Sequence, residues 1–144
     1  MSLINSDIVR AELAAIWPKL KFVVLSDPAW MAPLVGDLRD YLRLRWRPAR
    51  PPYLARLSEC EEFALGLVAH QRRWHAEQIL AGADTGTGNW PLGIVVGTKF
   101  GGRDIDHWAN ICRTADAGIV LIEPQTCAVW PAAAAGDQIY FLLM

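Results

Sequence analysis

The stretch SECEEFALGLVAHQRRW, residues 58 to 74, places Cys60 beside two glutamates at the point where an apolar run begins. Ser58 followed three residues later by Glu61 is the pattern of a capping box, which marks the start of a helix. We therefore expect a long helix over residues 58 to about 78. With Ser58 as the cap, Cys60 occupies the second helical position, near backbone N–H groups that have no partner within the helix.

The predicted position of Cys60 suggests two interpretations. The positive end of a helix dipole and unpaired N–H groups lower the pKa of a thiol, and the same N–H groups can bind an oxyanion. A single cysteine at a helix start is, however, more often a packing residue than a reactive one. The other two cysteines, Cys112 and Cys127, fall in or beside predicted strands and are interpreted as inert thiols.

Outside this stretch the periodicity predicts helices first and strands afterwards. Helices are expected over residues 5–20 and 33–44, with a short strand at 22–25 and a proline-rich break at 46–53. From residue 90 onward, short β-branched or aromatic runs predict four strands of a mostly antiparallel sheet. These runs are LGIVVGT (92–98), DHWANICR (106–113), GIVLIEP (118–124) and QIYFLLM (138–144). The order indicates an α+β domain with the Cys-bearing helix packed on the sheet.

Composition narrows the class of protein. The 144 residues fit one domain, residues 1–144, and 53% of them are hydrophobic, which predicts a real core. The formal net charge of −1 gives no electrostatic reason to expect nucleic acid or membrane as a partner. The sequence shows no leader pattern, no apolar segment of membrane-spanning length and three cysteines without a Cys-x-x-Cys pair. A reducing cytoplasmic location is expected, or delivery by a route that leaves no leader.

A reactive thiol needs a base, and the histidines narrow the choice. Two of the three share the Cys60 helix and would lie roughly 15 and 22 Å away, at about 1.5 Å rise per residue. His107, at the start of a predicted strand, remains. If the following hairpin is centred on Ala115, His107 and Glu123 face each other across two strands. Asn110 is an alternative partner for the imidazole, although strand alternation turns it to the opposite face.

The motifs CEEFAL, HWANI and IEPQT together resemble those of papain-like, transglutaminase-like cysteine peptidase domains. The likeness covers residues 50–144 and is strongest to the C-terminal peptidase domain of a fairy-ring mushroom agglutinin and its bacterial relatives. It implies a papain-like fold, with a sheet of about four strands packed on the Cys-bearing helix. It also implies a catalytic triad of Cys60, His107 and Glu123. The lectin domain of the agglutinin has no counterpart here, so sugar binding is not expected.

The resemblance assigns supporting roles to further residues. Tyr53 stands where relatives carry an aromatic near the oxyanion position, and Gln125 belongs to the Glu-Pro-Gln motif. Trp108 replaces a small residue and would narrow the groove. Glu62 stands where the family has an aspartate, so it is a possible calcium ligand, although no cofactor is required by the sequence.

The expected function is that of a cysteine hydrolase that cleaves amide bonds in peptides or peptidoglycan-like substrates. Cys60 would attack, His107 would transfer the proton, and Glu123 would fix the imidazole. Two alternatives remain open. One is an acyl transferase with the same residues, and the other is a catalytically silent domain used for binding or structural assembly, for example in a phage particle.

Overall fold

The computed structural model describes residues 1–55, 59–83 and 88–144. The helical segments are α1 (Ser6–Ile16), α2 (Val35–Tyr41), the π-helical turn η1 (Leu42–Trp46), α3 (Arg47–Ala49) and α4 (Cys60–Leu80). The strands are β1 (Ser2–Asn5), β2 (Phe22–Val24), β3 (Ala29–Ala32), β4 (Leu92–Phe100), β5 (Arg103–Thr114), β6 (Gly118–Glu123), β7 (Ala128–Pro131) and β8 (Gln138–Leu143).

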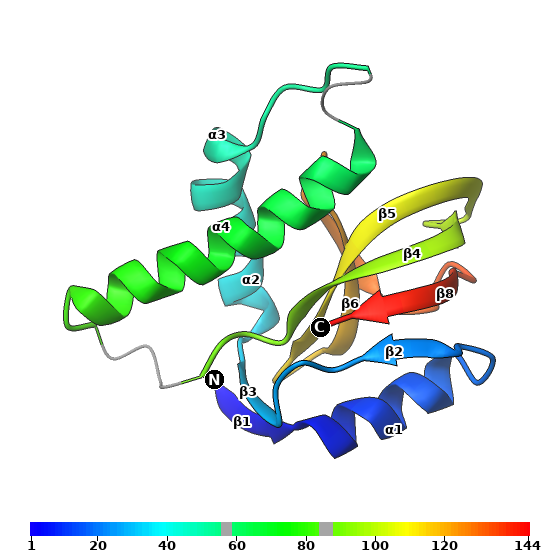
Figure 1. The fold of residues 1–144 in the computed structure, drawn as a ribbon, viewed down its shortest axis with the longest axis horizontal. Helices are drawn as coiled ribbons and strands as arrows, with labels where there is room; N and C mark the ends of the chain where they lie inside the picture. The colour runs from blue at the N-terminus through cyan, green and yellow to red at the C-terminus, as the bar shows by residue number, and fades with distance from the viewer. Residues whose placement is uncertain (56–58, 84–87) are drawn as a thin grey trace.

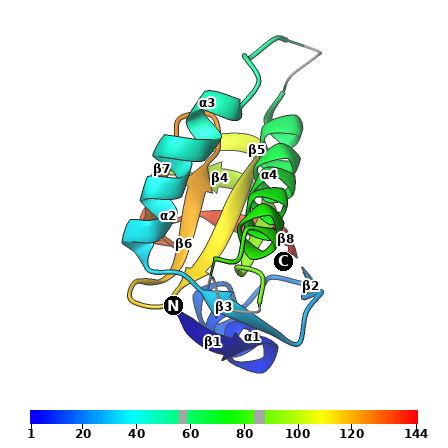
Figure 2. The ribbon, with the colours of Figure 1, turned by 90° about the vertical axis from the view of Figure 1, so that its left-hand side faces the viewer.

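A six-stranded sheet forms the centre of the molecule (Figure 1). Its strand order is β2-β8-β4-β5-β6-β7, and its pairs are antiparallel except for the parallel edge pair of β2 with β8. Strands β1 and β3 form a separate antiparallel pair beside α1. In Figure 2, α4 and the α2–η1–α3 segment lie side by side along the sheet.

The sheet is covered on both faces because its central strands are apolar on both sides. Ile111 and Leu121 belong to one core cluster together with residues of α1. Their chain neighbours Cys112 and Val120 belong to the other cluster, together with residues of α2, η1 and α4. Successive strand residues point to opposite faces, so each strand contributes to both cores. The result is a three-layer arrangement of helix, sheet and helices.

The predicted fold class is wrong in its architecture. The four predicted strands are present, but the sheet has six strands rather than about four, and the helices do not show a papain-like arrangement. Strand β7 is only four residues long and ends in Pro131, so its sequence gives no periodic signal. Strand β2 joins the sheet through a parallel pairing with β8, at the far end of the chain, which local sequence patterns do not predict.

The Cys-bearing helix is present, but it begins later than predicted. The predicted cap, Ser58, lies outside the described residues. The structure has Glu59 as the N-cap in a capping box with Glu62, whose Oε2 accepts the Glu59 backbone N–H at 2.9 Å. Cys60 is therefore the first helical residue. The helix expected to end at residue 44 instead continues through η1 to Ala49.

The hairpin of β5 and β6 differs from its predicted register by two residues. Ile111 pairs with Leu121 and Thr114 with Gly118, so the hairpin is centred on Asp116 rather than Ala115. A shift of one residue would have moved every side chain to the other face, whereas a shift of two preserves the faces.

Among the described residues, no helix is both long and apolar enough to cross a membrane.

Candidate functional site

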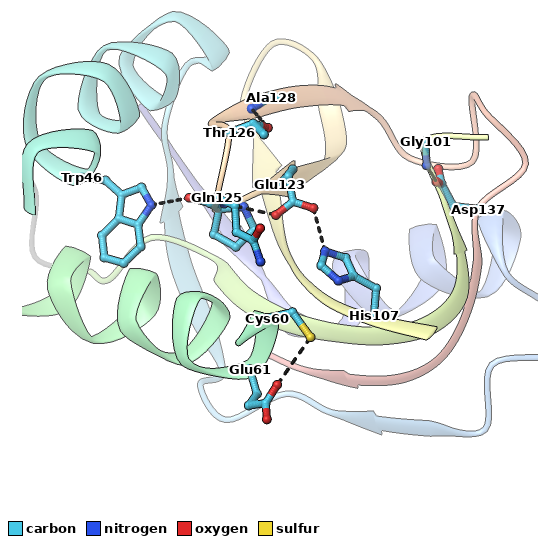
Figure 3. Close-up of polar contacts among 11 residues, drawn as sticks. Trp46, Cys60, Glu61, Gly101, His107, Glu123, Gln125, Thr126, Ala128 and Asp137 are labelled. Carbon is cyan, nitrogen blue, oxygen red and sulfur yellow. Dashed lines mark hydrogen bonds and ion pairs between the residues drawn. The ribbon is translucent and has the colours of Figure 1, made fainter. Parts of the chain in front are cut away.

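His107 and Glu123 are in direct contact, which confirms that they are neighbours across β5 and β6. His107 Nε2 and Glu123 Oε2 are 2.6 Å apart, and the two side chains are 10% and 12% exposed (Figure 3). The second carboxylate oxygen of Glu123 accepts the backbone N–H of Gln125 at 3.1 Å. The ring of Phe100 packs edge-on against the imidazole, with centroids 5.5 Å apart. Together these contacts fix the imidazole in one orientation.

Cys60 lies at the start of α4, and Figure 3 shows its sulfur on the side of His107. The thiol donates to Glu61 Oε2 at 3.4 Å. Burial raises the pKa of the Cys60 thiol, and the adjacent Glu61 carboxylate raises it further. Backbone N–H groups of Trp108 and Glu61 act in the opposite direction but do not reverse the shift. The expectation of a lowered thiol pKa was therefore wrong, because it considered the helix dipole and not burial.

These side chains line one open groove of about 520 Å³. Its walls come from the segment before α4, the start of α4, the first half of β5 and the end of β6. The lining residues used below are Tyr53, Cys60, Arg103, His107, Glu123 and Gln125. Tyr53 is 61% exposed, so its ring is available at the rim. The groove thus combines a thiol, an imidazole, carboxylates, a guanidinium, an amide and one aromatic ring.

Two of the predicted supporting residues have structural roles. The buried Asn110 donates its amide to the carbonyl oxygens of Ala64 and Gly93, at 2.9 and 3.0 Å, and thereby ties α4 to the sheet. It faces away from His107, as strand alternation predicted. Glu62 is used in the helix cap. No cluster of three His, Cys, Asp or Glu side chains that could hold a metal occurs within the described ranges, and the calcium role of Glu62 stays a prediction.

A second hollow, which the sequence analysis did not identify, lies on the sheet next to the groove. It has a volume of about 440 Å³ and is lined by Phe22, Val96, Trp108, Tyr140 and Phe141. The register places four of these residues in one row across β2, β8, β4 and β5. Three of the four, Phe22, Phe141 and Trp108, are visibly aromatic in the sequence, but the place of Phe22 in the row depends on the parallel β2–β8 pair. Trp108 belongs to both sites, because its side chain lines the hollow and its backbone N–H lowers the pKa of the Cys60 thiol.

The electrostatic effect of Glu61 on the thiol can be tested directly. We expect Glu61→Gln to alkylate several-fold faster than the wild type at pH 7, because removal of the carboxylate lowers the thiol pKa and increases the thiolate fraction. The measurement is the rate of Cys60 alkylation against pH, followed by mass spectrometry of the labelled peptide. Glu62→Gln is the matched control, since Glu62 lies in the same helical turn but does not bond the sulfur. Equal rates in Glu61→Gln and wild type would contradict the effect.

Comparison with known proteins gives a match in structure but not in sequence. No protein-family model matches the chain, and no curated protein does. A solved structure described as the PSL1a-E64 complex matches with a TM-score of 0.75 and 21% identity, over 99% of this chain and 50% of the other. A structure of Polyporus squamosus lectin bound to the human-type influenza-binding epitope Neu5Acα2-6Galβ1-4GlcNAc matches with a TM-score of 0.73 and 20% identity, over 99% and 49%.

These matches correct the predicted identity. Both structures share the fold of this chain, one is described as a lectin, and neither description names a peptidase. The predicted membership in the papain-like cysteine peptidases is contradicted, and with it the hydrolase and acyl-transferase activities, the enzyme class and the peptide or peptidoglycan substrate. The chain spans about half the length of the solved chains that it matches.

Proposed function

We propose that this chain is a binding domain whose ligand is a carbohydrate. The observation that carries the proposal is the fold it shares with a lectin solved with a sialylated glycan. A shared fold with a lectin supports the alternative expectation of a catalytically silent binding domain better than the expectation of a catalytic one. Because the chain matches half of the lectin, the glycan named for the whole lectin is a candidate ligand for this half.

The chemistry of the two hollows supports this proposal. A sugar presents hydroxyl groups, which need hydrogen-bond donors and acceptors, and apolar ring faces, which pack on aromatic side chains. The groove around His107 offers an imidazole, carboxylates and the guanidinium of Arg103. The neighbouring hollow offers aromatic surface, with Phe22 64% and Tyr140 51% exposed. In this proposal Cys60, His107 and Glu123 form a wall of the binding groove.

The proposal predicts that two exposed aromatic residues contribute to glycan affinity. We expect Phe22→Ala and Tyr140→Ala each to weaken binding of Neu5Acα2-6Galβ1-4GlcNAc about tenfold, a loss of about 1.4 kcal/mol. Both residues are exposed, so the folded state should tolerate the changes. The measurement is isothermal titration calorimetry of the free trisaccharide. Ile79→Ala, an exposed apolar residue at the end of α4, is the control and should leave affinity unchanged.

A second probe distinguishes the two ligands that the matched descriptions name. E64 is added to the wild type and to Cys60→Ser, and binding is followed by intact mass and by thermal shift. The carbohydrate proposal requires glycan binding that survives in Cys60→Ser. If the protein instead takes E64 in a manner that depends on Cys60 and binds no glycan, the groove belongs to another class of ligand and the proposal is wrong.

A further inference from the structure

A separate cleft lies between η1 and α4, in the half of α4 remote from Cys60. It has a volume of about 520 Å³. Its lining side chains used here are Arg45, His70, Arg73, Trp74 and Glu77. Arg45 belongs to the π-helical turn, a geometry that is rare and frequent at functional sites. No residue that lines the groove around His107 or the hollow around Phe22 also lines this cleft.

Hydrogen bonding fixes the tautomer of His70 in this cleft. The Tyr41 hydroxyl lies 2.6 Å from His70 Nδ1, and Tyr41 is only 4% exposed. Burial raises the Tyr41 pKa, so the hydroxyl keeps its proton and that proton needs an acceptor. Nδ1 is the acceptor within reach, and a neutral imidazole must then carry its own proton on Nε2. His70 therefore presents a fixed N–H donor.

The aromatic residues around the cleft hold this donor in place. The ring of Tyr41 packs against those of Trp74 and Trp90, with centroids 5.2 and 5.6 Å apart. The ring of Trp46 packs edge-on against His70, with centroids 5.8 Å apart. Such packed rings leave little rotamer freedom. A ligand would then meet a preorganised imidazole, and binding would cost little ordering of the protein.

The remaining polar groups of the cleft are mainly donors. Within residues 1–55, 59–83 and 88–144, the guanidinium groups of Arg45 and Arg73 have neither an ion pair nor a hydrogen bond. The Nε1 of Trp74 is buried and lacks a hydrogen-bond partner in the same part of the chain. An indole N–H and a guanidinium can only donate. Glu77 is the one carboxylate among the lining residues and cannot balance two arginines.

We propose that this cleft binds a small ligand through a carboxylate or phosphate group held by Arg45, Arg73 and the Nε2–H of His70. Oxyanions accept several charge-assisted hydrogen bonds at once, and the guanidinium fork matches their planar arrangement of oxygens. Trp74 lines the same cleft, so its indole signal can report ligand binding there. The inference is independent of the proposed carbohydrate function, since no residue of the groove takes part.

The test uses inorganic phosphate and acetate as probes of the full chain. Each is titrated at low ionic strength while the indole N–H signals are followed by two-dimensional NMR, with Trp74 assigned through Trp74→Phe. We expect the Trp74 signal to shift with saturation for at least one probe, and the probe that binds tighter identifies the preferred oxyanion. We further expect Arg45→Gln/Arg73→Gln to weaken that binding at least about tenfold.

The controls are the neighbouring arginines Arg43 and Arg72, which do not line the cleft. Arg43→Gln/Arg72→Gln removes the same total charge from the same two elements and should change affinity less than about twofold. Tyr41→Phe, which frees the imidazole, should weaken binding while the other indole signals stay in place. Equal losses in the two double variants would show only a general charge effect and would overturn the proposal. A Trp74 signal that stays fixed with both probes would do so as well.

Discussion

Gly93→Ala is expected to destabilise the fold by more than about 3 kcal/mol, because the new methyl group has no space. A Cβ at residue 93 would lie 2.3 Å from the carbonyl oxygen of Leu143 and 2.8 Å from the Cα of Met144. Both are backbone atoms, so no side-chain rotation relieves the clash. Strand β4 lies between β8 and β5, and the strain would therefore open the centre of the sheet.

Urea denaturation followed by tryptophan fluorescence measures this loss, and Gly36→Ala is the matched control. Residue 36 lies inside α2, and a Cβ there would meet no atom within 4 Å. Alanine is a better helix former than glycine, so this variant should gain about 0.5–1 kcal/mol. If the two variants have equal midpoints, the close approach of β8 to Gly93 is not a determinant of stability.

The sequence predicted the contact of His107 with Glu123 because alternation along a strand is a local property. The hairpin centre was displaced by two residues, yet the parity of the two strands kept both side chains on one face. The start of α4 was likewise visible from its acidic residues, although the cap is Glu59 rather than Ser58. Local chemistry therefore placed these side chains close to their true positions.

Other features of the site depend on contacts between distant parts of the chain. The pKa of Cys60 is set mainly by burial, which the segments around it create only in the folded state. The row of side chains in the second hollow extends to Phe22 because Phe22 pairs with Phe141 across the parallel edge pair of β2 with β8. No local period reports such a pairing. The residue motifs thus correctly predicted that these side chains lie close together. They gave the wrong class of protein, because the choice of ligand also depends on lining residues that lie outside the motifs.

A second large effect is expected from Asp137→Ala, because this buried carboxylate joins three parts of the chain. Asp137 is 4% exposed. Its carboxylate accepts the Gly101 backbone N–H at 2.8 Å and the Trp130 indole N–H at 3.1 Å, and its backbone carbonyl accepts the Trp17 indole N–H at 3.0 Å. Hydrogen bonds to a charged group are worth about 1.5–3 kcal/mol each, and the two that the carboxylate accepts are partly buried.

The expected loss for Asp137→Ala is therefore about 2–4 kcal/mol in the free energy of unfolding, measured by urea denaturation. Asp116→Ala is the control: Asp116 also accepts a backbone N–H, from Val35 at 2.8 Å, but at an exposed site where water can replace it. That variant should lose less than about 1 kcal/mol.

Gly101 has a φ of 56° and belongs to the turn that leads into Arg103, so Asp137 also positions one wall of the groove. Under the carbohydrate proposal, Asp137→Asn, which keeps an acceptor for Gly101, should retain more glycan affinity than Asp137→Ala. A loss no larger than that of Asp116→Ala would show that the buried carboxylate contributes little, and that packing alone holds this turn against β8.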